Sequence, residues 1–559
     1  MSTLTLLPDS APFTEEQRAW LNGFLSGFIG IQDSPRSAHA AAAPHMSPAT
    51  LARAGVAPIG QEMSGGLEEP EEDWNDAVWH DASLSLDERM ELAKEKPPAA
   101  QLMAAMAQLD CGSCGYVCQS YAAALAGGTE KNLGLCSPGG KATKQAIKRV
   151  LHDIAPPSSK SEQAATGLSN NSGSPTDKSQ NNGETAGRWS RQNPYSAKLI
   201  EARPLNKAGS AKDTRHVVID LTDSGLKYEA GDALGVYPTN CPELVAAIVS
   251  SLSAESRTTV ATPAGNRKPL ELALFEDYCL REPSDELLEL LFQRIVAAEP
   301  KQQLQQFLSQ GAPAGLDVLD ALQLAAGATI TATEFVETLS PLAPRLYSIA
   351  SSMRQVGQQV HLTVGKINYD LNGRKRHGVA STLLSERLVV GQSLRVFVHS
   401  NHTGFTVPAD DTAPMIMVGP GTGIAPFMAF LQERQVRQAT GRNWMFFGEQ
   451  HAACDFLYEE QLKSYQSSGL LTHVDTAFSR DGEGKVYVQD RMRERSAEIW
   501  KWLQQGAHFY VCGDAASMAK DVDRTLRDIV ASQSKLSEAE CQQFMQELIR
   551  SRRYVRDVY

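Results

Sequence analysis

The pattern of hydrophobic and polar positions divides the chain into a helical N-terminal part, a polar stretch and a longer C-terminal part. In the N-terminal part, apolar residues recur at helical spacing after Thr14, and further helices are predicted to begin near Ser85 and to cover Ala99–Leu109. Residues 156–193 contain one Leu, one Trp and no Ile, Val or Phe. Because such a stretch cannot bury enough apolar surface to fold, we expect it to be a flexible linker.

The C-terminal part shows two successive arrangements of strands and helices. The first half contains strands interrupted by a long helical stretch, residues 241–335, and its strands are expected at 197–201, 216–221, 233–236, 346–350, 360–364 and 394–399. In the second half, short apolar strands alternate with helices, and the strands are expected at 414–418, 443–447, 471–477 and 508–512. This alternation predicts an α/β domain with a doubly wound parallel sheet.

Composition narrows the classes of function. The chain has 559 residues and a net charge of −12, which predicts a multidomain protein and argues against nucleic acid as a partner. No apolar run reaches the ~18 residues of a membrane helix, so we expect no membrane association. Residues 1–15 lack the charged and apolar regions of a secretory signal, and we therefore expect a cytoplasmic protein.

Four of the nine cysteines crowd into the segment Asp110–Gly140. Their spacing is Cys-x2-Cys-x3-Cys-x17-Cys, at Cys111, Cys114, Cys118 and Cys136. Thiolates suit iron–sulfur or zinc, but structural zinc sites usually show paired Cys-x2-Cys motifs. A 4Fe-4S cluster is therefore the favoured interpretation, with a zinc site or a metal-free segment as the alternatives. The segment also resembles the small four-cysteine iron–sulfur domain of several redox proteins, whose motif ends in Cys-x-Pro-Gly-Gly.

Two motifs in the C-terminal part suit a flavin. Arg345 can neutralise a pyrophosphate, Tyr347 on the same strand face can cover an isoalloxazine ring, and the Ser348 hydroxyl can hydrogen-bond flavin N5. The second motif, Gly378–Thr382, places a glycine and hydroxyls at the start of a helix, where phosphates bind. An ordinary helix cap is the alternative interpretation of this second motif.

Two further motifs suit a nicotinamide dinucleotide. Gly419–Gly423 follows a predicted strand and precedes a helix, so its backbone can approach a pyrophosphate. A set of hydroxyl, guanidinium, ammonium and aromatic groups then follows at Ser479, Arg480, Lys485, Tyr487 and Gln489. This set suits the 2′-phosphate of NADPH, where an NAD-specific site would place an acid. A solvated basic turn is the alternative interpretation.

Residues 195–559 resemble the FAD- and NADPH-binding half of the diflavin reductases, in the ferredoxin–NADP reductase family. Within that group they are most similar to the flavoprotein (alpha) subunits of NADPH-dependent sulfite reductase. The resemblance rests on stretches in matching order, which lie at residues 341–352, 419–427, 478–481, 485–490, 510–515, 518–522 and 552–559.

The resemblance implies an antiparallel β-barrel that binds FAD and carries a helical connecting insert, followed by a parallel-sheet NADP domain. It implies a hydride-transfer group of Ser348, Cys512 and Asp557, with Tyr559 stacked on the flavin. The other cofactor contacts that it implies are Arg345, Leu346, Tyr347, Thr363, Val364, Gly365, Tyr369, Gly378, Val379, Ala380 and Ser381, and, for NADPH, Gly421, Thr422, Ser479, Arg480, Lys485, Val486, Tyr487, Val488, Gln489 and Asp521.

We therefore expect a sequence of separate domains along the chain. They are a helical or irregular segment at 1–95, a small α/loop iron–sulfur domain at 96–155, the linker at 156–193, the FAD-binding barrel with its insert at 194–409, and the NADP-binding domain at 410–559. The family carries an FMN-binding flavodoxin domain before the FAD half, but residues 1–190 show no flavodoxin pattern. We therefore expect the iron–sulfur cluster to stand in place of FMN.

The sequence thus predicts an NADPH-dependent oxidoreductase with FAD and a 4Fe-4S cluster but no FMN. Electrons would pass from NADPH to FAD, and through the cluster to a partner, the haem (beta) subunit of an assimilatory sulfite reductase. An assimilatory nitrate or nitrite reductase is the alternative acceptor. An NADPH-linked redox sensor without turnover is an alternative from another class, and the intact group of Ser348, Cys512, Asp557 and Tyr559 argues against it.

Overall fold

The computed structural model of the chain describes residues 79, 85–108, 116, 118–128, 130, 133–136, 139–154, 188–252, 254–401, 404–515 and 517–559. The helix predicted after Thr14, most of the predicted linker, and both Cys111 and Cys114 lie outside these residues. Among the described helices, none combines the length and the apolar character needed to cross a bilayer.

Among the described residues before the linker, the helices are α2 (Leu86–Leu92), α3 (Pro98–Ala104), α4 (Cys118–Ala126) and α5 (Gly140–Ile154). The helix start predicted near Ser85 is confirmed, because the Ser85 side chain caps α2 and accepts a hydrogen bond from the Glu88 backbone N–H. Helix α3 ends earlier than predicted. Buried Arg89 donates hydrogen bonds to the carbonyls of Ala104 and Met106, which supplies partners that a longer helix would have provided.

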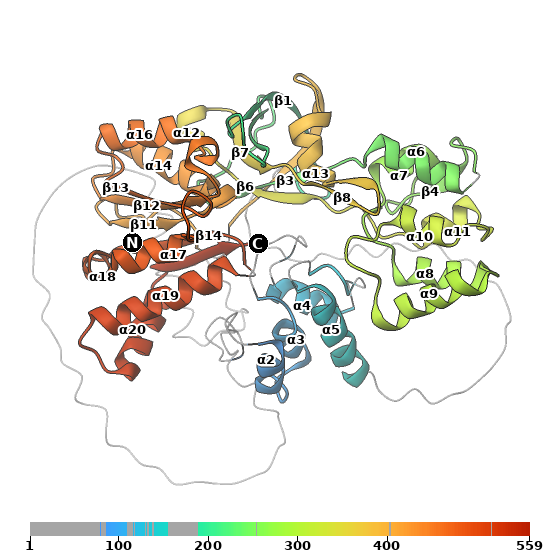
Figure 1. Cartoon of the computed structure of the whole chain (residues 1–559), viewed down its shortest axis with the longest axis horizontal. Helices are drawn as coiled ribbons and strands as arrows, with labels where there is room; N and C mark the ends of the chain where they lie inside the picture. The colour runs from blue at the N-terminus through green and yellow to red at the C-terminus, as the bar shows by residue number, and fades with distance from the viewer. Residues whose placement is uncertain are drawn as a thin grey trace, which may run out of the picture. The chain divides into compact units, whose positions relative to one another are not determined.

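An antiparallel sheet forms the first half of the C-terminal part (Figure 1). It contains β1 (Tyr195–Pro204), β2 (Thr214–Asp220), β3 (Ala233–Tyr237), β6 (Arg345–Ser348), β7 (Gln359–Gly365) and β10 (Ser393–His399), in the order β6-β3-β10-β1-β2-β7. An isolated bridge between Ile349 and Leu362 also joins the segment after β6 to β7, so the two edges of the sheet meet. Alternate side chains, such as Val360, Leu362 and Val364, fill one apolar core.

The insert between β3 and β6 is largely helical and has a core of its own. Its helices are α6 (Pro242–Ser251), α7 (Leu270–Glu276), α8 (Asp285–Arg294), α9 (Ala298–Gln310), α10 (Val318–Leu324) and α11 (Ala332–Glu337). The helical prediction missed a short hairpin, β4 (Thr259–Ala261) and β5 (Arg267–Pro269). Its turn uses Gly265 at a φ of +82°, a conformation that glycine adopts without strain. Short elements then follow the insert, namely α12 (Met353–Val356), β8 (Asn368–Leu371), β9 (Arg374–His377), α13 (Val379–Thr382) and η2 (Leu383–Arg387).

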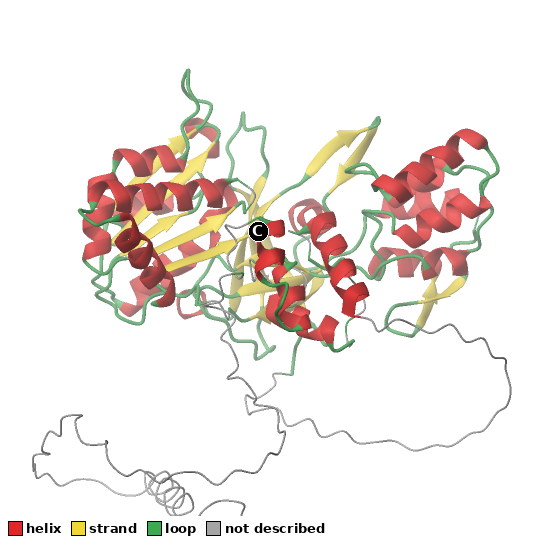
Figure 2. Cartoon of the chain, turned by 90° about the horizontal axis from the view of Figure 1, so that it is seen from below, coloured by secondary structure: helices red, strands yellow, loops and turns green. Residues whose placement is uncertain are grey.

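A parallel sheet forms the second half and confirms the predicted α/β domain (Figure 2). Its strands are β11 (Met415–Val418), β12 (Asn443–Glu449), β13 (His473–Phe478), β14 (His508–Gly513) and β15 (Tyr554–Val558), in the order β13-β12-β11-β14-β15. The accompanying helices are η3 (Gly421–Ile424), α14 (Ala425–Arg437), α15 (Ala452–Asp455), α16 (Glu459–Ser467), α17 (Val488–Glu494), α18 (Ser496–Gln504), α19 (Met518–Gln533) and α20 (Glu538–Arg550).

Both faces of the parallel sheet are covered. Along β11, Ile416 and Val418 belong to one apolar core, and Met415 and Met417 belong to another. Burial on both faces explains why this strand is continuously apolar in the sequence. Strand β15 was not predicted, because charged Arg556 and Asp557 interrupt its apolar pattern.

The last residues of the predicted linker pack on the antiparallel sheet. Trp189 Nε1 donates to the Ser224 carbonyl at 2.8 Å, and the Tyr237 hydroxyl donates to the Arg191 carbonyl at 2.6 Å. The polar composition of residues 156–193 concealed this contact, because a single tryptophan is enough to anchor a short segment.

Candidate functional site

The three side chains predicted to serve hydride transfer meet in the structure. Ser348 ends β6, Cys512 lies near the carboxyl end of β14, and Asp557 is its register partner on β15. The Ser348 hydroxyl donates to Asp557 Oδ2 at 2.8 Å, and Cys512 Sγ lies 3.8 Å from the same oxygen. A hydroxyl, a thiol and a carboxyl group from two sheets thus converge on one point.

Burial controls the charge of this group. It raises the pKa of the Cys512 thiol well above its ordinary value, and the nearby Asp557 carboxylate acts in the same direction. Cys512 is therefore protonated at neutral pH and can donate a hydrogen bond but cannot serve as a thiolate nucleophile. Burial also raises the pKa of Asp557, while hydrogen bonds from Ser348 and Cys512 oppose that rise.

These residues lie where the strand order of the parallel sheet reverses, between β11 and β14. Ligands of doubly wound sheets bind at this position, beyond the carboxyl ends of the strands. The loop Gly419–Gly423 joins β11 to α14 here, with Gly421 at a φ of +58°. A Cβ on Gly423 would clash with the Cys512 carbonyl. Glycine is therefore required for the loop to pass this close to β14, and the predicted pyrophosphate loop and Cys512 are neighbours.

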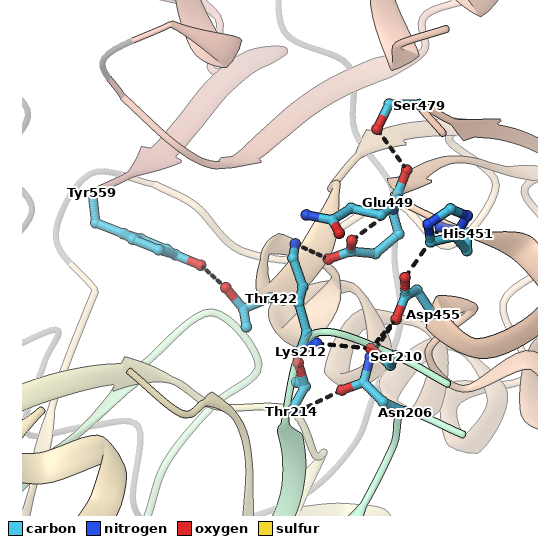
Figure 3. A network of polar contacts seen from close by, with 11 residues as sticks. Asn206, Ser210, Lys212, Thr214, Thr422, Glu449, His451, Asp455, Ser479 and Tyr559 are labelled. Atoms are coloured by element: carbon cyan, nitrogen blue, oxygen red, sulfur yellow. Dashed lines mark hydrogen bonds and ion pairs between the residues drawn. The ribbon is translucent and has the colours of Figure 1, made fainter. Parts of the chain in front are cut away.

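Tyr559 adjoins the same loop. Its hydroxyl lies 3.0 Å from Thr422 Oγ1, and its backbone N–H donates to the Gly513 carbonyl (Figure 3). A Cβ on Gly365, a predicted flavin contact in β7, would lie 3.3 Å from the Thr422 methyl group. The predicted FAD and NADPH contacts therefore approach each other at Thr422, beside Tyr559, a residue that is 51% exposed as a whole.

We expect Tyr559→Ala to narrow the preference for NADPH over NADH several-fold. Removal of the ring would let either nicotinamide reach the flavin more easily, so the 2′-phosphate would matter less. The measurement is kcat/KM for both cofactors with ferricyanide as the acceptor. Tyr559→Phe is the matched control, because it loses only the Thr422 hydrogen bond and should keep the preference. An unchanged preference in Tyr559→Ala would show that the ring does not limit access.

The other predicted flavin residues lie on four segments. Arg345, Leu346 and Tyr347 belong to β6, Thr363, Val364 and Gly365 to β7, and Tyr369 to β8, while Gly378, Val379, Ala380 and Ser381 open α13. The Ser381 hydroxyl accepts a hydrogen bond from the Ile367 N–H at 3.1 Å. The Val364 and Ala380 side chains are buried in the fold. These two residues can therefore offer a ligand only their backbone.

A cavity of about 290 Å³ adjoins this region, and Tyr369 and Val379 belong to its lining. Its basic lining residues are Arg281, Arg374, Lys375, Arg376, His377 and Arg387. Arg376 is buried, and its Nε has no hydrogen-bond partner among the described residues. A buried donor without a partner is costly, and a phosphate oxygen would satisfy it. Because Arg374 and Arg376 are already ion-paired with Asp317 and Asp320, the fit of this lining to a flavin phosphate rests on the unpartnered side of Arg376.

The predicted 2′-phosphate residues lie at and after the carboxyl end of β13. The backbone N–H groups of Ser479 and Arg480 donate to the carbonyls of Glu449 and Gln450, each at 2.9 Å. The side chains of Arg480, Lys485 and Tyr487 are exposed, and Val486 and Gln489 are partly buried. Val488 is buried in the apolar core, and Asp521 lies in the first turn of α19, 3.5 Å from Arg524. The basic side chains are therefore accessible to an anionic ligand.

The structure also reveals an interface that the sequence analysis missed, between the loop of residues 205–213 and residues 449–459 (Figure 3). Buried Asp455 accepts hydrogen bonds from Asn206 Nδ2 at 2.9 Å and from the Ser210 hydroxyl at 2.5 Å. These residues carry no motif and lie about half the chain apart, so no pattern in the sequence could have paired them.

Tyr458 extends this interface into the antiparallel sheet. Its hydroxyl lies 2.7 Å from Thr363 Oγ1 and 3.0 Å from His216 Nδ1. The Thr363 hydroxyl, which we expected at the flavin, is therefore engaged between the two sheets. Burial lowers the pKa of His216 from 6.5 to about 3, and His361, which packs edge-on against it, has its pKa lowered to about 4.

We expect these histidines to make the protein less stable in acid. The unfolded chain binds protons at both histidines below pH 6.5, but the folded state binds them only near pH 3 to 4. Stability should therefore be full above pH 6.5 and fall as the pH drops, by up to about 2 kcal/mol for His216 at pH 5. Urea unfolding at pH 7 and pH 5 measures this loss. His216→Gln should make the loss of stability between pH 7 and pH 5 smaller, whereas replacement of exposed His152 should leave that loss unchanged. An unchanged pH dependence in His216→Gln would contradict this assignment.

Two of the four predicted metal ligands lie among the described residues. Cys118 begins α4 and Cys136 precedes α5, and both are buried in the same apolar cluster. A Cβ on Gly139 would lie 3.1 Å from Cys136 Sγ, so the backbone passes close to this sulfur. No three metal-ligating side chains converge within the described residues, which do not include Cys111 or Cys114. The four-cysteine site remains a prediction.

Two families of known domains match the chain. The FAD binding domain matches residues 188–383, and the oxidoreductase NAD-binding domain matches residues 417–524. The first match covers most of the antiparallel sheet with its helical insert, and the second covers most of the parallel sheet. The fold and the matches together define an oxidoreductase that joins an FAD-binding domain to a nicotinamide-dinucleotide-binding domain.

Whole proteins that resemble this chain indicate a narrower family than the two domain matches do. The sulfite reductase (NADPH) flavoprotein alpha-component of Bacillus subtilis is 44% identical over 375 residues, which is 66% of this chain and 62% of the relative. The protein of the same name from Aliivibrio fischeri is 44% identical over 66% of this chain and 61% of the relative. The protein from Zymomonas mobilis is 41% identical over 75% of this chain and 67% of the relative. The chain therefore spans roughly three fifths to two thirds of these relatives, and it belongs to the family of sulfite reductase flavoprotein alpha-components.

Proposed function

We propose that the chain oxidises NADPH and delivers the electrons through FAD and a 4Fe-4S cluster to a partner reductase. The observation that carries the first half of this proposal is the convergence of Ser348, Cys512 and Asp557 beside the glycine-rich loop. The relatives are named as components of NADPH sulfite reductase, which favours the haem subunit of a sulfite reductase as the acceptor.

The roles of the converging residues follow from their geometry. FAD, when bound, accepts a hydride and releases electrons one at a time, which links a two-electron donor to one-electron carriers. Ser348 and Cys512 donate hydrogen bonds, and Asp557 orients both of them. A carboxylate at this point also favours the positive charge that develops on the nicotinamide as the hydride leaves. Tyr559, beside Thr422, would cover a bound flavin and exclude water from it, and the ring would have to move to admit a nicotinamide.

We assign the 4Fe-4S cluster to Cys111, Cys114, Cys118 and Cys136, in a domain at residues 96–155. The cluster supplies one-electron transfer. Burial of Cys118 and Cys136 in one apolar cluster, with Gly139 against the Cys136 sulfur, supports the assignment. Exclusion of water and close backbone N–H groups both tune the potential of such clusters.

The predicted cofactor contacts and domain boundaries form part of the same proposal. FAD would lie against residues 345–348, 363–365, 369 and 378–381, and NADPH would lie against 421–422, 479–480, 485–489 and 521. The FAD-binding domain would extend from about 188 rather than 194, since residues 188–193 pack on its sheet. The NADP-binding domain would cover 410–559.

The content of cofactors tests this proposal. We expect the purified protein to contain one FAD, about four irons and four acid-labile sulfides per chain, and no FMN. Flavin chromatography after denaturation and metal analysis measure these quantities. A stoichiometric FMN peak would contradict the replacement of FMN by a cluster, and tightly bound zinc without iron would contradict the cluster itself.

Two alternatives make different predictions. If the acceptor is a nitrate or nitrite reductase, that enzyme should be reduced by NADPH through this chain while the sulfite reductase haem subunit is not. If the chain is a redox sensor, NADPH should reduce it once without sustained turnover. Steady oxidation of NADPH with ferricyanide would exclude the sensor.

A further inference from the structure

An acidic residue directly follows two of the side chains that are predicted to bind the 2′-phosphate. These two are Ser479 and Arg480, and Asp481 comes next in the chain. An unpaired carboxylate at this place would repel a phosphate, and an acid near the ribose is typical of sites that prefer NAD. Asp481 therefore conflicts with a preference for NADPH unless the structure engages its carboxylate elsewhere.

Both oxygens of Asp481 are engaged by the segment that follows β12. Oδ1 lies 2.9 Å from His451 Nδ1, and Oδ2 accepts a hydrogen bond from the Ala452 N–H at 2.7 Å. These contacts lower the pKa of Asp481 below its ordinary value, and the Ala452 N–H is the largest cause. The carboxylate is therefore ionised at neutral pH. Because an ionised carboxylate can only accept, the His451 ring donates from Nδ1 in this pair.

The two residues before Asp481 lie against the same segment. The N–H groups of Ser479 and Arg480 donate to the carbonyls of Glu449 and Gln450, and the Ser479 hydroxyl donates to the Glu449 carbonyl at 3.3 Å (Figure 3). Within the described part of the chain, no backbone hydrogen bond holds the stretch that follows, residues 482–486. Asp481 is thus the last anchor before an unpaired stretch, and its contacts control the position of the neighbouring Arg480.

His451 is itself held by a buried group. Its N–H donates to Asp455 Oδ2 at 3.1 Å, and its carbonyl accepts a hydrogen bond from the Asp455 N–H at 2.8 Å. Asp455 is buried and also accepts hydrogen bonds from Asn206 and Ser210 of the antiparallel sheet domain. The donor that holds Asp481 is therefore fixed from the interior of the protein, although the histidine ring itself is partly exposed.

We propose that Asp481 and His451 are positioning residues for the choice of NADPH over NADH. Their contact holds Arg480 at the 2′-phosphate and engages the carboxylate that would otherwise repel it. This proposal rests on the proposed function, because it requires a 2′-phosphate at Arg480. Its consequence is selective: loss of the contact should weaken ligands that carry a 2′-phosphate and should spare NADH.

Asp481→Ala tests this role in the FAD-loaded full-length chain. We expect the Kd values for 2′-AMP and NADP⁺, measured by calorimetry, to rise about five- to ten-fold. The kcat/KM for NADH with ferricyanide should stay nearly unchanged. Glu498→Ala is the matched control, because Glu498 pairs with His473 at 3.0 Å and a similar exposure, at the start of β13 rather than beyond its end. It should change none of these quantities.

Variants of His451 separate a specific contact from a general loss of structure. His451→Ala should also raise the Kd for 2′-AMP, because Asp481 then loses one of its two donors. His451→Asn should retain most of the affinity, since its amide group can replace the Nδ1 donor. In a chain that already carries Arg480→Ala, Asp481→Ala should add little, because it acts through Arg480.

The results that would overturn the proposal are distinct from those that would overturn the proposed function. An equal loss with NADH in Asp481→Ala would indicate a general role in folding. Tighter binding of 2′-AMP by Asp481→Asn would show that the carboxylate acts only as an opposing charge. If Arg480→Ala binds 2′-AMP normally, the 2′-phosphate site is wrong and the inference fails with it. If Arg480→Ala binds weakly and Asp481→Ala binds normally, only the positioning role is wrong.

Discussion

Replacing Cys118 with serine is expected to abolish the reduction of a sulfite reductase haem subunit and to leave NADPH–ferricyanide activity largely intact. If the cluster is the relay, electrons must pass through it to reach a large partner, whereas a small oxidant can take them directly from FAD. Cys118 begins α4, before the predicted linker, and Ser348, Cys512 and Asp557 lie in the two sheet domains. The change should therefore separate the two activities.

Three measurements make this test decisive. Cys279→Ser is the matched control, since Cys279 belongs to the helical insert outside the cysteine cluster, and both activities should persist. A low-temperature paramagnetic signal should appear when NADPH is added to the unmodified protein and should be absent from Cys118→Ser. A chain that lacks residues 1–187 also lacks all four cysteines. If this chain still reduced the partner at the full rate, electrons would not need the cluster, and the relay hypothesis would be wrong.

Replacing Arg480 with alanine is expected to raise the KM for NADPH roughly ten- to a hundred-fold and to leave the KM for NADH little changed. A charge-assisted contact to a phosphate contributes about 1.5–3 kcal/mol, and each 1.4 kcal/mol corresponds to about ten-fold in affinity. Arg480 is exposed and lies two residues after the end of β13, at the carboxyl edge where the dinucleotide is expected.

Steady-state kinetics with both cofactors provide the measurement. Arg550→Ala is the control, because Arg550 is an exposed arginine of the same domain that pairs with Glu547 on α20. It should alter neither KM. An equal loss with NADPH and NADH in Arg480→Ala would indicate a general effect on the domain and would contradict the specific contact with the 2′-phosphate.

The sequence was most informative where the physical signal is local. Strand β11 is apolar at every position, the loop Gly419–Gly423 follows it, and α14 begins directly afterwards. Because each of these signals is complete within a few residues, the parallel sheet and its ligand-binding edge could be predicted. Two glycines of this loop have identifiable reasons. Gly421 has a positive φ, and a Cβ on Gly423 would clash with the Cys512 carbonyl.

The local sequence pattern did not predict structure at two places, the strand β15 and the segment around Trp189. Strand β15 contains Arg556 and Asp557, and it forms because it pairs with β14 rather than because its own pattern is apolar. Trp189 anchors the end of a stretch whose average composition predicts no structure. In both cases, the energy comes from contacts with another segment, which the local pattern does not contain.

The sequence pattern by itself thus predicted the parallel sheet with its glycine-rich loop, whereas the antiparallel sheet and the group of residues proposed for hydride transfer came from the family resemblance. Only the tertiary structure decided which of those residues meet, because Ser348 and Asp557 lie 209 positions apart. It alone also paired Lys212 with Glu449, which are 237 positions apart. Hydrogen bonds and ion pairs depend on distance in space. The residues near a charged loop position do not indicate which distant residue will lie within that distance, so the sequence pattern cannot predict the pair.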